Sequence, residues 1–429
     1  MAKLQAVVLA AGQAERFNTG NTKLLEKVCG QEIILYTTQL LEELGIPTTV
    51  VIGHQGERIR ECMQKKKLND INFVYQEKLH GRGNALLCSR PEWFANNIIV
   101  MNGDTPFVTK EIIESLARKH TKQAAAISLV KSHCCDPSSH SYDHIIRNDN
   151  GQVEIVSVNE CSANFQESCC IDAGIYIIDK DFLYECTESI ALDNSEARFH
   201  ISDLLREANR RGHVVEVLSA PFDRIRSIDT FQDLWCAQQV KRAELMKHWM
   251  KRGVHFFTAQ NVHLDLDVTI GAGTFIGCGV QLFGNTHIKA NAHIGHFSII
   301  EQSTIEEHVA IRPHSTLSNT HVEQHAVVGP FACLEACTIK AYATICGNVG
   351  ATRSFIGEHA RVENFSYLND SHIEKKKVIT AGTVMPNHKF APNKADDGKV
   401  LCAKRCDEGI NKKNKQQSTR STTIKQREL

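Results

Sequence analysis

The strongest constraint on the fold is a repeat in the second half of the chain. Between Ile270 and Ile373 an aliphatic residue returns every five or six positions, usually with a small residue four positions later. From Ile300 onward the steps run five, six, six, which gives a period of 17 residues. Neither a helix nor an isolated strand has this period. It is typical of a three-sided parallel β-helix, in which the aliphatic residues fill the prism and one corner is a residue tighter than the others.

Length and composition restrict the remaining possibilities. The 429 residues suffice for two or three domains, and a formal net charge of zero gives no argument for a nucleic-acid or membrane partner. There is no run of about 18 apolar residues, and the run MAKLQAVVLAAG leads into a glycine turn, as a first buried strand does. The 16 cysteines are scattered or directly adjacent, which favours reduced thiols over disulfides or zinc ligands. We therefore expect a cytoplasmic protein.

The first half of the chain alternates strand-like and helix-like segments. This order predicts a mostly parallel sheet covered on both faces. We expect four parts: a domain over residues 1–228, a linker helix over 229–252, the β-helix over 253–385, and a polar, basic tail over 386–429 that is disordered. The predicted strands are AVVLAA, TTVVIG, INFVY, NIIVMNGD, AAISLV and AGIYIID, and the predicted helices include Ile33–Leu44, Gly83–Ser89 and Lys110–Lys119.

A glycine turn after the first strand is the first candidate site. It reads LAAGQAERF, from Leu9 to Phe17, with Lys23 a few residues later. A glycine here lets backbone N–H groups approach a phosphate, and Arg16 and Lys23 would add positive charge for a triphosphate. The alternative, a plain strand–turn–helix with two solvated cations, is equally compatible with this motif alone.

A carboxylate after a second buried strand is the next candidate. Asp104 follows NIIVMNG, where ligands bind at the carboxyl edge of a parallel sheet. Oxygen ligands at such a place suit Mg²⁺, which is commonly held by one or two carboxylates together with substrate phosphates. The alternative is an N-cap for the helix Lys110–Lys119, although several residues intervene.

These motifs together resemble a known family. LAAG with Arg16 and Lys23, then YQEKLHGRGNA, NGDTPF, DAGIYI and the β-helix, are similar to the bacterial bifunctional N-acetylglucosamine-1-phosphate uridylyltransferase / glucosamine-1-phosphate acetyltransferase family over about residues 3–373. The resemblance implies a Rossmann-like nucleotidyltransferase domain followed by a left-handed parallel β-helix of hexapeptide repeats. It also implies a homotrimer formed through the β-helix, and a product used in cell-wall and lipopolysaccharide precursor synthesis.

The resemblance also assigns site residues. Arg16 and Lys23 match catalytic cations, although Thr22 replaces the usual proline. Asp104 matches one Mg²⁺ ligand, and Asp229 stands where the family has an asparagine ligand. The nucleotide-binding positions are Leu9, Ala10, Ala11, Gly12, Lys23, Gln76 (which matches the residue that reads the uracil), Gly81, Arg82 (usually threonine) and Gly103.

The sugar and acetyl-transfer positions depart from the family. Asp172 replaces an asparagine and Asp143 a glycine among the sugar contacts. In the β-helix, Asn364 stands at the catalytic histidine and Glu335 at an arginine, while GNVGATRS is a residue shorter than the family segment. An amide cannot act as a general base near neutral pH. We therefore expect acetyl transfer to be lost, unless His359 or His372 has taken over as the base.

The sequence hypothesis is an enzyme that uses Mg²⁺ to transfer a uridylyl group from UTP to a sugar 1-phosphate, by default N-acetylglucosamine 1-phosphate. Two alternatives stay open. One is a nucleotidyltransferase for another sugar 1-phosphate, and the other is a trimeric nucleotide-binding paralogue without turnover. The seven histidines from His287 to His325 are expected to be solvated surface groups rather than metal ligands.

Overall fold

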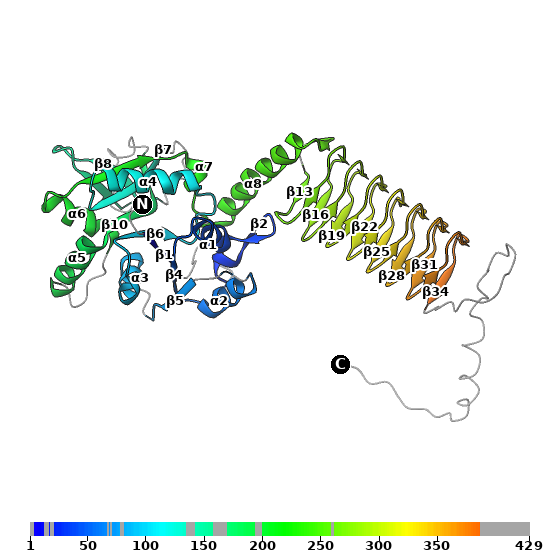
Figure 1. The fold of residues 1–429 in the computed structure, drawn as a ribbon, viewed down its shortest axis with the longest axis horizontal. Coiled ribbons are helices and arrows are strands. Elements are labelled where there is room, and N and C mark those ends of the chain that lie inside the picture. Colours follow the sequence, from blue (N-terminus) through cyan, green and yellow to red (C-terminus); the bar gives the residue numbers. More distant parts are fainter. Residues whose placement is uncertain are drawn as a thin grey trace, which may run out of the picture. The chain divides into compact units, whose positions relative to one another are not determined.

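The computed structural model describes residues 4–12, 17, 21–66, 68, 71–77, 81–133, 142–157, 170–193, 200–258 and 261–386 (Figure 1). The chain forms two compact units, residues 1–247 and 248–429. Of the predicted tail over residues 386–429, all but residue 386 lies outside the described residues. In the part of the chain that is described, no helix has both the length and the apolar composition needed to cross a bilayer.

The first unit is built on a mostly parallel sheet, as predicted. The strand order is β11-β7-β10-β6-β1-β4-β5, and β10 alone on this path runs against its neighbours. A hairpin, β8 with β9, extends from β10. The strands are β1 (Leu4–Ala10), β4 (Thr48–Ile52), β5 (Ile71–Tyr75), β6 (Asn97–Asn102), β7 (Ile127–His133), β8 (His144–Arg147), β9 (Val153–Val156), β10 (Cys170–Asp179) and β11 (Val215–Ser219), with a small ribbon of β2 (Lys27–Val28) and β3 (Gln31–Glu32).

Helices cover both faces of this sheet. The central strands are apolar at consecutive positions, because both of their faces are buried. One core includes Ile33 of α1, Ile59 of α2, Ile113 of α4 and Leu234 of α8, whereas the other includes Leu86 of α3, with Leu183 and Leu204 of α5 and α6. The helices are α1 (Ile33–Glu43), α2 (Gly56–Lys65), α3 (Arg82–Cys88), α4 (Lys110–Lys122), α5 (Lys180–Asp193), α6 (Ile201–Arg210), α7 (Phe222–Ile225) and α8 (Phe231–Lys251), with 3-10 turns η2 (Lys23–Leu25) and η3 (Arg90–Glu92).

The second unit is the predicted β-helix, whose coils stack in Figure 1. Sheet 1 contains β12 (His255–Phe256), β15 (Phe275–Ile276), β18 (His293–Ile294), β21 (Ala310–Ile311), β24 (Val327–Val328), β27 (Thr344–Ile345), β30 (Arg361–Val362) and β33 (Val378–Ile379). Sheet 2 contains β13 (His263–Leu264), β16 (Gln281–Phe283), β19 (Ile299–Glu301), β22 (Thr316–Ser318), β25 (Cys333–Glu335), β28 (Gly350–Thr352), β31 (Tyr367–Asn369) and β34 (Val384–Pro386). Sheet 3 contains β14 (Thr269–Ile270), β17 (His287–Ile288), β20 (Thr304–Ile305), β23 (His321–Val322), β26 (Thr338–Ile339), β29 (Phe355–Ile356) and β32 (His372–Ile373).

The aliphatic ladder fills the interior of the β-helix, which confirms the interpretation of the repeat. Ile276, Leu317 and Ile345 are fully buried, and small residues such as Ser315 and Ala343 fill the corners. The tight corner of the 17-residue coils follows sheet 2. There Thr320 lies three positions after Leu317, whereas Ala326 lies four positions after Val322. The backbone at the corners takes positive φ, for example +57° at Asn291 and +50° at Asn319.

Candidate active site

The carboxyl ends of β1 and β6 form one edge of the first sheet. Residues Leu9, Ala10, Ala11 and Gly12 lie at the end of β1 and just after it. The Gly103 N–H donates to the Leu9 carbonyl at 3.0 Å, and a Cβ at Gly103 would lie 2.6 Å from Ile34 Cδ1. Only glycine therefore lets the segment after β6 approach Leu9 and helix α1 without a shift of Ile34. Arg16 lies outside the described residues, so its predicted role is not tested.

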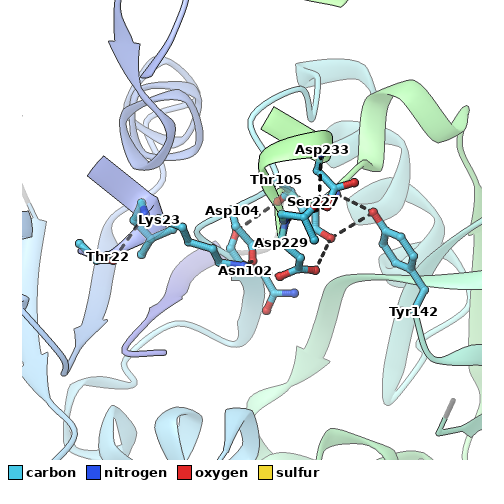
Figure 2. Close-up of polar contacts among 11 residues, drawn as sticks. Thr22, Lys23, Asn102, Asp104, Thr105, Tyr142, Ser227, Asp229 and Asp233 are labelled. Carbon is cyan, nitrogen blue, oxygen red and sulfur yellow. Dashed lines mark hydrogen bonds and ion pairs between the residues drawn. The ribbon is translucent and has the colours of Figure 1, made fainter. Parts of the chain in front are cut away.

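Lys23 lies between two carboxylates at this edge (Figure 2). Its Nζ donates to Asp104 Oδ2 at 2.6 Å and to Asp229 Oδ1 at 2.5 Å. Burial alone would lower the pKa of Lys23, but the two carboxylates outweigh this effect and hold its pKa above the usual value. Asp104 and Asp229 are 81 and 206 positions from Lys23 in the sequence, and the three side chains form one charged cluster.

Thr22 positions this lysine. It is the N-cap of η2, its hydroxyl accepts from the Leu24 N–H at 3.4 Å, and its own N–H donates to Gln55 Oε1 at 3.2 Å. Threonine thus replaces the proline of the resembled family with a side chain that caps the turn. The replacement therefore leaves Lys23 in a defined place.

The carboxylates of Asp104 and Asp229 fit a divalent cation. Asp104 Oδ1 is buried and has no hydrogen-bond partner, which is costly unless another group meets it. Its backbone carbonyl accepts from the Ile228 N–H at 3.1 Å, which ties the loop after β6 to the segment that carries Asp229. Within the described ranges no group of three or more His, Cys, Asp or Glu side chains is arranged to hold a metal ion by itself. Two carboxylates that Lys23 now bridges suit Mg²⁺, which keeps waters and takes substrate phosphates as its other ligands.

A hydrogen-bond network that the sequence analysis missed orients Asp229 (Figure 2). Ser227 Oγ donates to Asp229 Oδ2 at 3.1 Å and lies 3.1 Å from the Tyr142 hydroxyl, which also accepts the Ser227 N–H at 2.9 Å. Burial raises the pKa of Tyr142 to about 12, so its phenol stays protonated at neutral pH. The Asp233 carboxylate accepts from the N–H groups of Asp229 and Thr230 at 3.2 and 2.9 Å. This reciprocal cap was readable from the pattern Thr-x-x-Asp, but the Tyr142 contact spans 85 residues and was not.

Gln76 and Gly81 meet beyond the end of β5. The Gln76 side chain is buried, and its Nε2 donates to the Gly81 carbonyl at 3.3 Å. Gly81 is the N-cap of α3 with φ of +94°, a conformation that L side chains rarely adopt. The structure therefore holds the two residues side by side, and their nucleotide-binding role stays a prediction.

The predicted acceptor residues form a second charged cluster. β10 is antiparallel to β6, so its first residues lie at the carboxyl edge of the parallel strands. Arg82 Nη2 donates to Asp143 Oδ2 at 2.9 Å, and the Asp143 carbonyl accepts from the Asp172 N–H at 2.9 Å. Asp143 directly follows Tyr142, so one dipeptide connects this cluster with the Lys23 cluster.

Asp172 is satisfied within the protein. Its Oδ1 accepts from the Gly174 N–H at 3.1 Å, and its Oδ2 accepts a short hydrogen bond from the Tyr176 hydroxyl. Burial raises the pKa of Asp172 to about 6, although the Tyr176 hydroxyl and Arg82 oppose this effect. Because both oxygens already have donors, the sugar contact predicted for Asp172 would require Tyr176 or Gly174 to share it.

The β-helix histidines lie outside this edge. His287, His293 and His321 are on strands and His308, His314 and His325 are at corners, and all six are exposed. The prediction of surface imidazoles agrees with this exposure, although only half of these six lie at corners. The seventh, His296, is half-buried, and its Nδ1 accepts the Cys278 N–H at 3.0 Å, so for this residue the prediction of a solvated surface group was wrong.

Comparison with known proteins places this geometry in a class. Residues 6–147 match the family described as MobA-like NTP transferase domain. The first unit is therefore that of a nucleotidyltransferase of the sugar 1-phosphate type, and in this chain a left-handed β-helix follows it. The bifunctional protein GlmU of Listeria welshimeri is 30% identical over 320 residues, covering 73% of this chain and 69% of the relative. The bifunctional protein GlmU of Exiguobacterium sibiricum is 28% identical over 313 residues, covering 72% and 68%. The chain belongs to the family of the bifunctional protein GlmU.

Proposed function

We propose that the protein is a magnesium-dependent uridylyltransferase that makes UDP-N-acetylglucosamine and pyrophosphate from UTP and N-acetylglucosamine 1-phosphate. The observation that carries the proposal is Lys23 held at 2.6 and 2.5 Å between Asp104 and Asp229 at the carboxyl edge of a parallel sheet. This cluster combines a cation for phosphate with two oxygen donors for a metal. The membership of the chain in the GlmU family supports the choice of substrates.

The reaction needs no protein nucleophile. An oxygen of the sugar phosphate attacks the α-phosphorus of UTP, the new O–P bond forms, the bond from the α-phosphorus to the β-phosphate oxygen breaks, and pyrophosphate leaves with that electron pair. The attacking phosphate is already an anion, so no base is required. Catalysis then rests on alignment and on neutralisation of negative charge.

The chain supplies these two effects. Asp104 and Asp229 would hold Mg²⁺, which when bound neutralises phosphate charge. Lys23 then turns from the carboxylates to the phosphates, and Arg16 adds a second cation. The backbone of Leu9–Gly12 and Gly103 lies along the triphosphate, Gln76, Gly81 and Arg82 bind the nucleotide at the uracil side, and Asp143 and Asp172 contact the sugar.

Pyrophosphate release tests this proposal. Asp104→Asn and Asp229→Ala should each lower turnover by about 100-fold or more, because each removes charge from the reacting phosphates rather than from a core. Asp149→Asn in the exposed β8–β9 turn is the matched control and should keep full turnover. Near-wild-type release by both site variants would refute the site.

A second candidate concerns the acceptor. The Asp172–Tyr176 pair fills a position where the resembled family has a neutral asparagine, which favours an altered sugar pocket. The same assay with UTP or dTTP against a panel of sugar 1-phosphates decides between the two candidates. Release with no member of the panel would support the non-catalytic paralogue instead.

We also propose that the β-helix has lost acetyl transfer. Asn364 Oδ1 accepts the Gly347 N–H at 2.8 Å, so the amide caps a coil. Arg353, the cation of the segment GNVGATRS, donates two hydrogen bonds of 2.7 Å to Asp370. Its positive charge is therefore already paired within the chain. His359 lies at the corner after sheet 3 and His372 on sheet 3, whereas Asn364 follows sheet 1. Neither histidine is therefore placed to replace the lost base.

Thiol release from acetyl-CoA with glucosamine 1-phosphate is the measurement. We expect no turnover above the buffer rate, since loss of a general base alone costs about 100- to 10,000-fold. Turnover that disappears in His359→Ala or His372→Ala would show that the second activity survives.

The proposal also includes a homotrimer formed through the β-helix and a cytoplasmic location.

A further inference from the structure

One corner of the β-helix carries large exposed rings. This corner follows sheet 1, and its residue with positive φ is Phe297, Phe331 or Phe365 on alternate coils, at φ of +56°, +55° and +61°. On the other coils the same corner carries His314 at φ of +59° and Gly279, Asn348 and Gly382, and glycine and asparagine are the residue types that tolerate this conformation best. Phenylalanine is therefore strained where the backbone favours glycine or asparagine.

These rings are also open to solvent. Phe297, Phe331 and Phe365 are 53%, 54% and 69% exposed. His314 stacks between Phe297 and Phe331, with its ring centroid 5.2 and 4.9 Å from theirs. This stacking accounts for part of the preference for rings at these two positions. None of the ring contacts in the described part of the chain involves Phe365. Within one chain its ring thus combines backbone strain with exposed apolar surface.

The adjoining flank of sheet 2 continues the apolar surface. Two positions after the corner, Ile299, Tyr367 and Val384 are 36%, 48% and 56% exposed. We call the six residues Phe297, Ile299, Phe331, Phe365, Tyr367 and Val384 the ring stripe. Successive coils are about 4.8 Å apart, so the five steps from Phe297 to the last coil extend it over roughly 24 Å.

The corner that follows sheet 3 has a different character. Its rings, such as Tyr342 stacked on His325 and His359 at 4.9 Å, lie beside ion pairs between coils. Lys289 pairs with Glu306 at 2.7 Å and Lys375 with Glu358 at 2.6 Å. Charges on both sides favour a solvated surface there, so the two corners of the same backbone are not equivalent.

We infer that the ring stripe is the surface through which copies of this chain associate, with their β-helices side by side and parallel. A large aromatic side chain buries about 150–250 Å². Six large side chains at about half exposure thus offer on the order of 500–700 Å², close to the roughly 800 Å² per partner of a standard interface. In a ring about an axis parallel to the prism, each coil lies at the level of the same coil of its neighbours, so the ring stripe of one copy meets coils of equal height on the next copy. The inference gives contact residues to the trimer of the proposed function and rests on that part of it.

The test is a pair of substitutions that suit the backbone. In the double variant Phe331→Asn with Phe365→Asn, asparagine takes the residue type of Asn348 at the same corner, so the full chain should keep its circular dichroism spectrum. Tyr342→Asn is the matched control, because Tyr342 is 46% exposed at φ of +59° but lies on the other corner. Light scattering during dilution of the full chain gives the mass, and pyrophosphate release is measured on the same samples.

We expect an oligomeric wild type, an unchanged control, and at least about 100-fold weaker association of the double variant. A monomeric wild type at micromolar concentration, an unchanged double variant, or equal dissociation of Tyr342→Asn would each overturn the inference. Absence of pyrophosphate release in every sample would refute the nucleotidyltransferase proposal alone, because the mass data stand without it.

Discussion

Substitution of Lys23 by methionine probes the charged cluster most directly. The variant keeps a side chain of similar length but leaves Asp104 and Asp229 without the cation between them, with side chains only 15% and 28% exposed. Opposite charges about 4 Å apart attract by roughly 4 kcal/mol at an effective dielectric constant of 20. The cost of desolvating Lys23 offsets part of this attraction, and solvent at Asp229 screens more of it. We therefore expect unfolding of the first unit to become easier by about 2–4 kcal/mol.

This loss should depend on pH and on Mg²⁺. The pKa of folded Lys23 is raised, so its stabilisation is complete below the unfolded lysine pKa and is lost only as the pH rises through the folded value. The whole loss is thus visible at pH 7. Because the bare carboxylates should bind Mg²⁺ without competition from Lys23, saturating Mg²⁺ should restore about 2.7 kcal/mol at 100 times its Kd. The wild type should gain less in the absence of nucleotide.

Thermal melts at pH 7 with and without Mg²⁺ measure both effects. A loss of about 2–4 kcal/mol corresponds to roughly 5–15 °C in Tm for a unit of this size. Lys27→Met is the control, since its pair with Glu32 is 3.6 Å long, the lysine is 60% exposed, and such pairs contribute less than about 1 kcal/mol. A Lys23→Met variant as stable as Lys27→Met, or one that Mg²⁺ does not stabilise more than the wild type, would refute the reasoning.

Two further predictions concern the acceptor side of the site. Burial raises the pKa of Asp172 to about 6, so its contribution to stability is complete below about pH 4 and is lost as the pH rises through 6. Asp172→Asn should therefore raise the free energy of unfolding relative to the wild type above pH 6 but not at pH 4, by up to about 2–3 kcal/mol, and an equal difference at pH 4 and pH 8 would contradict this. Gly174→Ala should lower the free energy of unfolding in urea by about 1–3 kcal/mol, because its Cβ would lie 2.3 Å from Asn102 Nδ2. Gly151→Ala, with φ of +75° and open space around it, should show the backbone strain alone.

The fold was predictable where one periodicity governs many residues. The five, six, six spacing specifies the β-helix because every inward position obeys it, and Ile276, Leu317 and Ile345 are all buried as expected. The alternation of apolar strands and helices likewise specifies a mostly parallel sheet. The reversed direction of β10 was not predictable, because a strand buried on both faces has the same apolar pattern in either direction.

From local patterns alone, the site was predictable only through residues that follow strands, whereas Asp229 was assigned by the family resemblance. Asp104 is recognisable because it comes directly after β6. The Tyr142–Ser227 contact joins loops 85 residues apart, and no local pattern in either loop announces it. The internal partners of Asp172 depend on the register shift between Asp172 and Tyr176, where β10 pairs irregularly with β7. Such contacts arise from tertiary packing rather than from local propensity.

In the β-helix, inward and outward positions answer to different constraints. An inward residue must be aliphatic or small in every coil, so it says little about what the protein does. An outward residue is free of that demand, so its identity reflects either chance or a contact. Asn364 and Arg353 are outward or corner residues whose polar groups are met within the chain, by Gly347 and Asp370. Phe365 is met by no ring and stands at positive φ. An exposed ring at positive φ without a ring partner in its own chain is the stronger evidence of a partner, which is why the ring stripe, rather than the positions of Asn364 and Arg353, is the surface of this unit to test first.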